Sequence, residues 1–371
     1  MSTPIASASA ATPAAEDEPL SVERIDEIRD FYVWDNPDQN EAVANSFCFR
    51  ARPGFVRIAG TEIEGWLDGL LSHIRQKHAE DTDFTVTYGD FIFRGHRDHT
   101  VDGALLALRR IPKHVPRLQD LTFPNNWTDF FLLPSLLKGG LVLIAAVTGQ
   151  GKSTTLGAIV KSRLEEFGGF CRTIEDPPEL LLHGAHGNGI CVQTPVESSG
   201  PNASTYAAAL KSALRSYPTI PSGGTICMVG EVRDPETAAD LVRAAVNGHL
   251  VLTTVHAADV ATAVGRLYAL AAAAMDPGAA KDLLSSAVRI VVHQELEIDH
   301  KEAGWRKGRL KGDLVYSGGS SSALANVIKE GKIASGMNQI VSTQATLVRQ
   351  TRRGSMAELL HRLDGTQQRN G

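Results

Sequence analysis

The sequence predicts an α/β protein with a parallel sheet in its C-terminal part and a smaller α+β domain before it. Beyond residue 125, short apolar runs alternate with stretches of helical periodicity; the runs are 141–147, 226–229, 250–252 and 290–292. Continuous apolar strands between helices are typical of a parallel sheet covered on both faces. Before residue 111 the pattern changes to one amphipathic helix flanked by segments of alternating polarity, which is typical of an α+β domain.

Length and charge narrow the class of protein. A chain of 371 residues is long enough for two domains. The formal net charge is −5, from 37 Lys and Arg against 42 Asp and Glu, which argues against an overall electrostatic grip on nucleic acid. Aromatic residues make up only 6% of the chain, which argues against a long base-stacking surface. We therefore expect no nucleic-acid partner.

The spacing of the cysteines and the length of the apolar runs argue against a structural zinc site and a membrane-spanning helix. The four cysteines lie far apart in the sequence without any CxxC pair, so no structural zinc is expected, and this usage fits a reducing cytoplasm. They are Cys48, Cys171, Cys191 and Cys227. The apolar run from Leu141 to Val147 is far shorter than the roughly 20 residues of a membrane-spanning helix. We expect a cytoplasmic protein.

The domain boundaries follow from composition. Residues 1–20 are rich in Ala, Ser, Thr and Pro, without the basic start and apolar core of a secretory signal, and are predicted to be a disordered tail. Residues 21–111 form the predicted α+β domain, in which a helical stripe runs from Ile63 to Ile74. Prolines at 112, 116 and 124 mark residues 112–124 as a linker, and residues 125–371 form the larger domain.

A glycine turn at residues 146–154, AVTGQGKST, joins an apolar strand to a helix that follows at 153–167. This strand, turn and helix are the context of a phosphate-binding loop. Glycines allow backbone N–H groups to surround phosphates, the lysine reaches the β- and γ-phosphates, and the serine hydroxyl binds Mg²⁺. Ala146 replaces the first glycine of the motif, so the loop must start at negative φ. The predicted nucleotide-binding residues are Thr148, Gly149, Gln150, Gly151, Lys152, Ser153 and Thr154. A chance turn, or a site that binds without hydrolysis, remains the alternative.

Acidic residues follow two further predicted strands. Glu231 ends the strand ICMVGE, and we expect it to polarise the attacking water if this strand neighbours the phosphate-loop strand. Glu175 and Asp176 follow a short strand in TIEDPPE and are predicted Mg²⁺ ligands, partly through water. The alternatives are a solvated glutamate and an ordinary acidic turn.

Two histidines, His249 and His256, stand at the two ends of the predicted strand in GHLVLTTVH. An extended chain places them roughly 20 Å apart, so they cannot share one metal ion. One or both are candidates to sense the γ-phosphate or to contact a neighbouring site. The alternative is that they are structural histidines whose ring nitrogens are hydrogen-bonded within the protein core.

Together these motifs resemble those of the secretion-superfamily ATPases, the motors of type II and type IV secretion and of type IV pili, over roughly residues 84–371. AVTGQGKST resembles their Walker A motif, TIEDPPE their aspartate box, ICMVGEVRDPETA their Walker B motif with glycine for the usual aspartate, and GHLVLTTVH their histidine box. The resemblance implies a C-terminal RecA-like P-loop NTPase domain that hydrolyses ATP with Mg²⁺. It also implies a homo-hexamer, peripheral to the inner membrane, that works with membrane-embedded components. The implied catalytic residues are Lys152, Glu175, Glu231, His249 and His256.

The resemblance also maps a pair of site-completing arginines to Arg94 and Arg109. In a hairpin of residues 91–95 and 104–110 around a polar loop, a symmetric register would place these two arginines opposite each other. Facing guanidinium groups repel unless an anion lies between them, and a γ-phosphate would serve. Two solvated surface arginines are the alternative, and Arg97 and Arg110 replace the pair if the register slips.

The absence of a paired-CxxC insertion makes the chain more similar to pilus-retraction (PilT-like) motors and to Dot/Icm-type and conjugal-transfer ATPases. Its start, with FYVWDNPDQN, is unlike a pilus motor and favours a type IV secretion or conjugal-transfer ATPase. A retraction motor is the first alternative. A non-hydrolysing assembly platform is an alternative of another class, and a DNA-acting recombination ATPase is disfavoured by the acidic charge balance.

Overall fold

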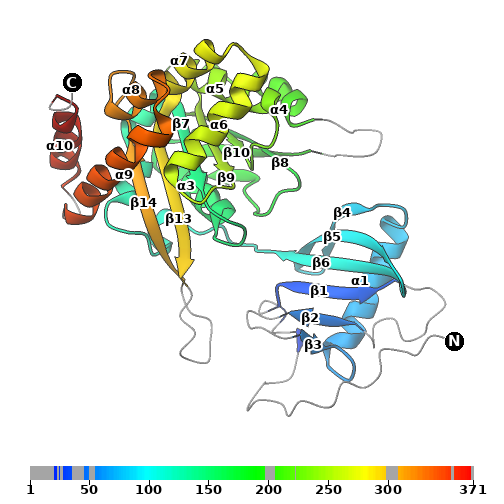
Figure 1. Ribbon diagram of the computed structural model, residues 1–371. Helices are drawn as coiled ribbons and strands as arrows, with labels where there is room; N and C mark the ends of the chain where they lie inside the picture. Colours follow the sequence, from blue (N-terminus) through cyan, green and yellow to red (C-terminus); the bar gives the residue numbers. More distant parts are fainter. Residues whose placement is uncertain are drawn as a thin grey trace. The chain divides into compact units, whose positions relative to one another are not determined.

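The computed structural model describes residues 21–22, 25, 28–35, 46–49, 55–196, 205–221, 223–297, 308–351 and 355–368. The chain divides into two compact units, residues 1–111 and 112–371 (Figure 1). Each unit has a mixed α/β structure with its own sheet, as the sequence predicts. The tail expected at residues 1–20 lies outside the described residues.

The first unit is an antiparallel sheet with one helix against it. The sheet has six strands in the order β3-β2-β1-β6-β5-β4. The strands are β1 (Asp30–Trp34), β2 (Phe47–Phe49), β3 (Phe55–Arg57), β4 (Asp83–Tyr88), β5 (Phe91–Thr100) and β6 (Gly103–Ile111). Helix α1 (Ile63–Lys77) buries the predicted stripe against the sheet, with Leu67, Leu70 and Ile74 fully covered. The amphipathic helix expected from the sequence is therefore confirmed.

The β5–β6 hairpin is longer than the sequence suggested. The expected polar loop at 96–103 is strand for most of its length, because His96, Arg97 and Asp98 pair with Ala107, Leu106 and Leu105. The register is symmetric and places Arg94 directly opposite Arg109, as predicted. The polar residues of β5 are accommodated because their side chains find partners inside the unit.

One of these partners is a buried carboxylate, Asp35. It binds Arg97 Nη2 at 3.0 Å and Arg75 Nε at 2.7 Å, and the Asp35 and Arg97 side chains are only 10% and 9% exposed. The Asp35→Ala variant leaves both guanidinium groups without this carboxylate, so we expect it to lower the free energy of unfolding by about 3 kcal/mol. Denaturant titration measures this. Asp102→Ala, in the exposed β5–β6 turn, is the matched control and should change stability by less than about 0.5 kcal/mol. Equal effects of the two variants would contradict a stabilising role for Asp35.

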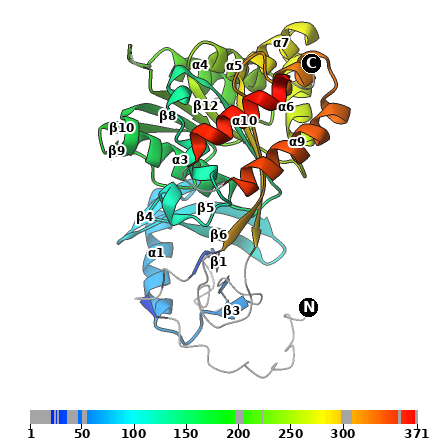
Figure 2. The ribbon, with the colours of Figure 1, turned by 90° about the vertical axis from the view of Figure 1, so that its left-hand side faces the viewer.

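The second unit is built on a mostly parallel sheet of eight strands in the order β14-β13-β7-β12-β11-β8-β10-β9 (Figures 1 and 2). The two edge strands β14 and β9 are antiparallel to their neighbours, and the other pairs are parallel. The predicted apolar runs are β7 (Gly140–Ala145), β11 (Thr225–Val229), β12 (Leu250–Val255) and β13 (Val288–Glu297). The remaining strands are β8 (Gly169–Glu175), β9 (Gly184–His186), β10 (Gly189–Pro195) and β14 (Arg309–Tyr316).

Helices cover both faces of this sheet, which explains why its central strands are apolar throughout. One face packs against α4 (Tyr206–Leu214), α5 (Pro235–Val246), α6 (Val260–Ala274), α7 (Pro277–Ala287), α8 (Ala323–Lys329) and α9 (Ile333–Gln350). The other packs against α2 (Trp127–Phe131), α3 (Lys152–Phe167) and α10 (Met356–Gln368). Helices α5, α6 and α7 begin alike, because Asp234, Asp259 and Asp276 each accept a hydrogen bond from the N–H three residues on. No described helix is long and apolar enough to cross a membrane.

The segment expected to be a linker, 112–124, belongs to the second unit. Val115, Leu118 and Phe123 are 4%, 0% and 5% exposed and lie in the same core as Trp127. A short 3₁₀ turn, η2 (Leu118–Asp120), lies within it, and another, η3 (Pro134–Lys138), precedes β7. The prolines prevent regular structure, as expected, but the apolar residues between them still bury their side chains. The boundary between the units therefore falls between Ile111 and Pro112.

Candidate functional site

The phosphate loop lies between the end of β7 and the start of α3. Gly149 and Gly151 have φ of +81° and +79°, a conformation that glycine adopts without strain. Among the described non-glycine residues only Asn126 has positive φ, so Ala146 enters the loop at negative φ, as predicted. Lys152 Nζ crosses the loop and donates to the carbonyl oxygens of Ala146 and Val147, both at 3.0 Å. Burial lowers the pKa of Lys152, which the charges of Glu231 and Glu179 partly oppose.

His256 and Glu231 join Lys152 in one cluster. His256 Nδ1 lies 3.3 Å from Lys152 Nζ, and His256 Nε2 lies 3.4 Å from Glu231 Oε1. The other oxygen of Glu231 accepts from Arg233 Nη2 and Nε at 2.9 and 3.1 Å. The expected role of Glu231 depended on its strand being a neighbour of the phosphate-loop strand; in the structure β12 lies between β7 and β11. The imidazole of His256, at the end of β12, therefore bridges the lysine and the glutamate.

Glu175 and Asp176 lie at the same edge, where β8 ends beside β11. Glu175 is 5% exposed, and its Oε1 accepts from Gln193 Nε2 at 3.0 Å. Burial raises the pKa of Glu175, while the hydrogen bond from Gln193 opposes the shift. Burial also raises the pKa of Tyr206 to about 12, and the charge of Asp176 adds to this shift. Carboxylate and hydroxyl oxygens are the ligands that Mg²⁺ prefers, so Glu175, Asp176 and Ser153 at the start of α3 are chemically suited to hold it, partly through water.

His249 precedes the first residue of β12 and so lies at the opposite end of the parallel strands from the phosphate loop. Its Nδ1 is 3.0 Å from Thr225 Oγ1 at the start of β11, and its ring centroid is 4.6 Å from that of Tyr217. Burial lowers the pKa of His249. The sequence placed this histidine in the catalytic set, but the length of β12 separates it from the phosphate loop of its own chain.

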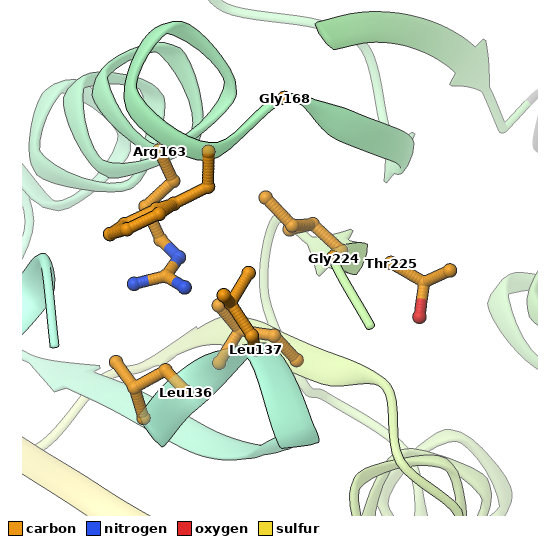
Figure 3. A pocket seen from close by; sticks show the side chains of 9 residues that line it. Leu136, Leu137, Arg163, Gly168, Gly224 and Thr225 are labelled. Carbon is orange, nitrogen blue, oxygen red and sulfur yellow. The ribbon is translucent and has the colours of Figure 1, made fainter. Parts of the chain in front are cut away.

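A depression beside the start of β11 is filled by the side chains that line it (Figure 3). It is lined at the starts of the strands by Leu137, Gly224 and Thr225, and Figure 3 shows Arg163 reaching into it from α3. Arg163 Nη1 donates to the carbonyl oxygens of Phe131 and Leu133, and burial lowers the pKa of Arg163 to about 10. Arg163 therefore braces the chain before β7 and leaves no room for a ligand there.

A cavity of about 170 Å³ lies beside the phosphate loop and the start of α3. Its lining comes from the loop and start of α3, the segment around η2, and the β13–β14 hairpin. The lining residues are Asp120, Leu121, Thr122, Gly151, Thr154, Thr155, Leu296, Gly308 and Leu310. The cavity could not be anticipated, because residues near 120 and 310 come together only in the folded chain.

Arg94 and Arg109 face away from α1 in the first unit, since Phe93 and Leu108, which alternate with them, are buried in its core. Arg109 Nε binds Asp30 Oδ1 at 2.6 Å, whereas no described residue pairs with the Arg94 side chain. Arg97 is bound to Asp35, and Arg110 Nε donates to the Ile28 carbonyl at 3.1 Å, so both alternatives are engaged within the unit. The symmetric register places Arg94 opposite Arg109, and of these two only Arg109 is paired with a described residue, Asp30.

Cysteines of the second unit lie within the sheet, at Cys171, Cys191 and Cys227, and are fully buried. Burial raises the pKa of Cys171 and Cys227, the latter to about 12, so both remain protonated thiols rather than metal-binding thiolates. Within the described ranges no group of three or more His, Cys, Asp or Glu is placed to hold a metal ion.

The phosphate loop after β7, together with acidic residues that end neighbouring parallel strands, defines a P-loop nucleotide-binding domain. The sequence model of the type II/IV secretion system protein family matches residues 83–361, and the chain belongs to this family.

Comparisons with individual proteins agree with this assignment. The chain is 35% identical over 272 residues to the uncharacterized protein YggR of Escherichia coli K12, covering 72% of this chain and 75% of that one. A crystal structure of the pilus retraction motor PilT with bound ADP aligns at a TM-score of 0.67 and 24% identity, covering 89% of this chain and 92% of that one. The ATPase DotB of Legionella pneumophila aligns at 0.62 and 20% identity, covering 91% and 90%. The two structures confirm the predicted fold, and the family match confirms the predicted superfamily.

Proposed function

We propose that this chain is the ATP-hydrolysing motor of a type IV secretion or conjugal-transfer machine. It would act as a homo-hexamer on the cytoplasmic side of the inner membrane, against membrane-embedded components. The chain is an ATPase of the type II/IV secretion family. The observation that carries the enzymatic part is the continuous contact from Lys152 through His256 to Glu231 beside the phosphate loop.

Each side chain of this edge has a chemical task in the proposal. Backbone N–H groups of Thr148–Thr154 and the positive end of α3 would hold the phosphates, and Lys152 would neutralise the β- and γ-phosphates. Bound Mg²⁺ would neutralise charge on the phosphates, with Ser153, Glu175 and Asp176 as its oxygen ligands. Glu231 would orient and deprotonate the attacking water. His256, in contact with both Lys152 and Glu231, would link phosphate occupancy to the position of that carboxylate.

The cavity beside the loop suits the base of the nucleotide, since apolar side chains and the start of α3 line it. The Leu296→Trp variant would fill this space, and we expect it to weaken ATP binding by at least about tenfold. Binding of inorganic tripolyphosphate, which has no base, should not change. A competition assay with a fluorescent ATP analogue measures both. Val246→Trp, at an exposed position of α5, is the control. Parallel losses for ATP and tripolyphosphate would place the base elsewhere.

Arg94 and Arg109 would complete the site from the first unit of a neighbouring subunit. Their guanidinium groups face each other across the hairpin, where Asp30 pairs with Arg109, and the γ-phosphate would supply the negative charge beside Arg94. An assembly in which one subunit contributes to the next subunit's site explains why the proposed motor works as a ring.

The biological part of the proposal is tested in cells. Deleting the chain's gene should abolish transfer of protein or DNA cargo through the envelope while surface motility by pili stays intact, and the native gene but not its Glu231→Gln form should restore transfer. Loss of pilus retraction with normal cargo transfer would instead establish the retraction motor, whose PilT representative has the same fold. A gene whose Glu231→Gln form restores transfer fully would establish the non-hydrolysing platform.

A further inference from the structure

A buried amide side chain, that of Gln294 on β13, holds the phosphate loop in place. Gln294 is 0% exposed. Its Oε1 accepts from Thr155 Oγ1 at 2.9 Å, and its Nε2 donates to the Gln150 carbonyl oxygen at 2.7 Å. Thr155 lies in the first turn of α3, so one amide joins the loop, the helix and β13.

The contact is reciprocal. Gln150 Oε1 accepts from the backbone N–H of Leu296 at 2.5 Å, two residues beyond Gln294. The apex of the loop is thereby bonded to β13 through both its carbonyl and its side chain. The sequence marked Gln150 as part of the phosphate loop but gave no sign of Gln294, because the contact joins positions more than 140 residues apart.

The apex needs such support because of the glycines beside it. Rotation of the peptide between residues 150 and 151 changes ψ of Gln150 and φ of Gly151, and the glycine at 151, at φ of +79°, permits that rotation. In a planar trans peptide the C=O and the following N–H point in opposite directions. While Gln294 holds the Gln150 carbonyl toward β13, the Gly151 N–H is held pointing away from β13.

We propose that Gln294 is a positioning residue for the nucleotide phosphates, which keeps the Gly151 N–H in the orientation that donates to a phosphate oxygen. The inference rests on the nucleotide binding proposed above and extends it to a residue outside the loop. Without this amide, the peptide between residues 150 and 151 samples the flipped orientation, in which its carbonyl oxygen would face the phosphates and repel them. Nucleotide affinity would then fall, because binding would have to turn the peptide back.

Gln294→Met tests the inference in the full chain, since methionine keeps the shape of the side chain and removes both hydrogen bonds. The matched control is Gln344→Met on α9. Gln344 is 4% exposed, and its amide binds the N–H and C=O of Tyr316 at 2.8 and 3.1 Å, in another part of the unit. Both variants lose two buried hydrogen bonds, so both should lower the melting temperature. Only Gln294→Met should weaken ADP binding, by about tenfold.

Gln294→Glu supplies an independent test. It preserves the acceptor for Thr155 but places a carboxylate oxygen against the Gln150 carbonyl, so ADP binding should weaken at least as much as in Gln294→Met. This variant also decides the question if Gln294→Met does not fold. Calorimetry or displacement of a fluorescent ADP analogue provides the affinities.

The measured ADP affinities distinguish the possible outcomes. Native affinity in a folded Gln294 variant would overturn the positioning role and leave the proposed ATPase intact. An equal loss in Gln344→Met would reduce the effect to general destabilisation and overturn it as well. A native chain that binds no ADP would overturn both the inference and the proposed function.

Discussion

Glu231→Gln is expected to abolish ATP turnover while leaving nucleotide affinity near the native value. Glutamine keeps the size of the side chain and can still bind near His256, but it cannot take a proton from water. Loss of a general base lowers turnover by about 10²–10⁴-fold. Phosphate release under saturating ATP measures turnover, and displacement of a fluorescent analogue measures affinity.

The matched control for this variant is Glu236→Gln. Glu236 lies on the first turn of α5, five residues further on, and its side chain is 61% exposed beside Lys211. It should retain native turnover. If Glu231→Gln hydrolysed ATP at the native rate, Glu231 would not be the base, and the contact with His256 would have only a structural role.

The Arg94→Ala variant is expected to show the second large effect. The Arg94 side chain, which no described residue pairs with, faces Arg109 across the hairpin. If it neutralises charge on the γ-phosphate, its removal should lower turnover by about 10³-fold or more, the range of arginine fingers. The melting temperature should change little, because the Arg94 side chain makes no hydrogen bond or ion pair with a described residue. Single-turnover hydrolysis by the purified full chain measures the effect.

Arg57→Ala is the control for this prediction. Arg57 is an exposed arginine on β3 of the same sheet, stacked over Phe55 at 5.8 Å. Its removal should leave turnover unchanged. Equal turnover in Arg94→Ala and the native chain would mean that Arg94 is an ordinary surface residue, which is the alternative that the sequence left open.

Local patterns predicted the parts of the site that form within one segment. The loop at 146–154, the strand before it and the helix after it follow from a continuous stretch of chain, as does the register that opposes Arg94 and Arg109. Burial in the segment 112–124 was not apparent, because proline signals broken regular structure and carries no information about packing.

Contacts between distant segments were beyond local patterns. The sequence does not reveal the spatial order of the strands in the sheet. In that order β12 lies between β7 and β11, which places His256 between Lys152 and Glu231. The amide of Gln193 on Glu175 and that of Gln294 on the loop gave no motif, because isolated glutamines in strands are common in both exposed and buried positions.

The most direct test of the account is steady-state hydrolysis of ATP by the purified full chain, followed with and without Mg²⁺ in a sample whose assembly state is measured alongside. We expect turnover by a hexamer that requires Mg²⁺ and is lost in Glu231→Gln. A closed ring that binds ATP and Mg²⁺ but releases no phosphate would contradict it and favour an assembly platform.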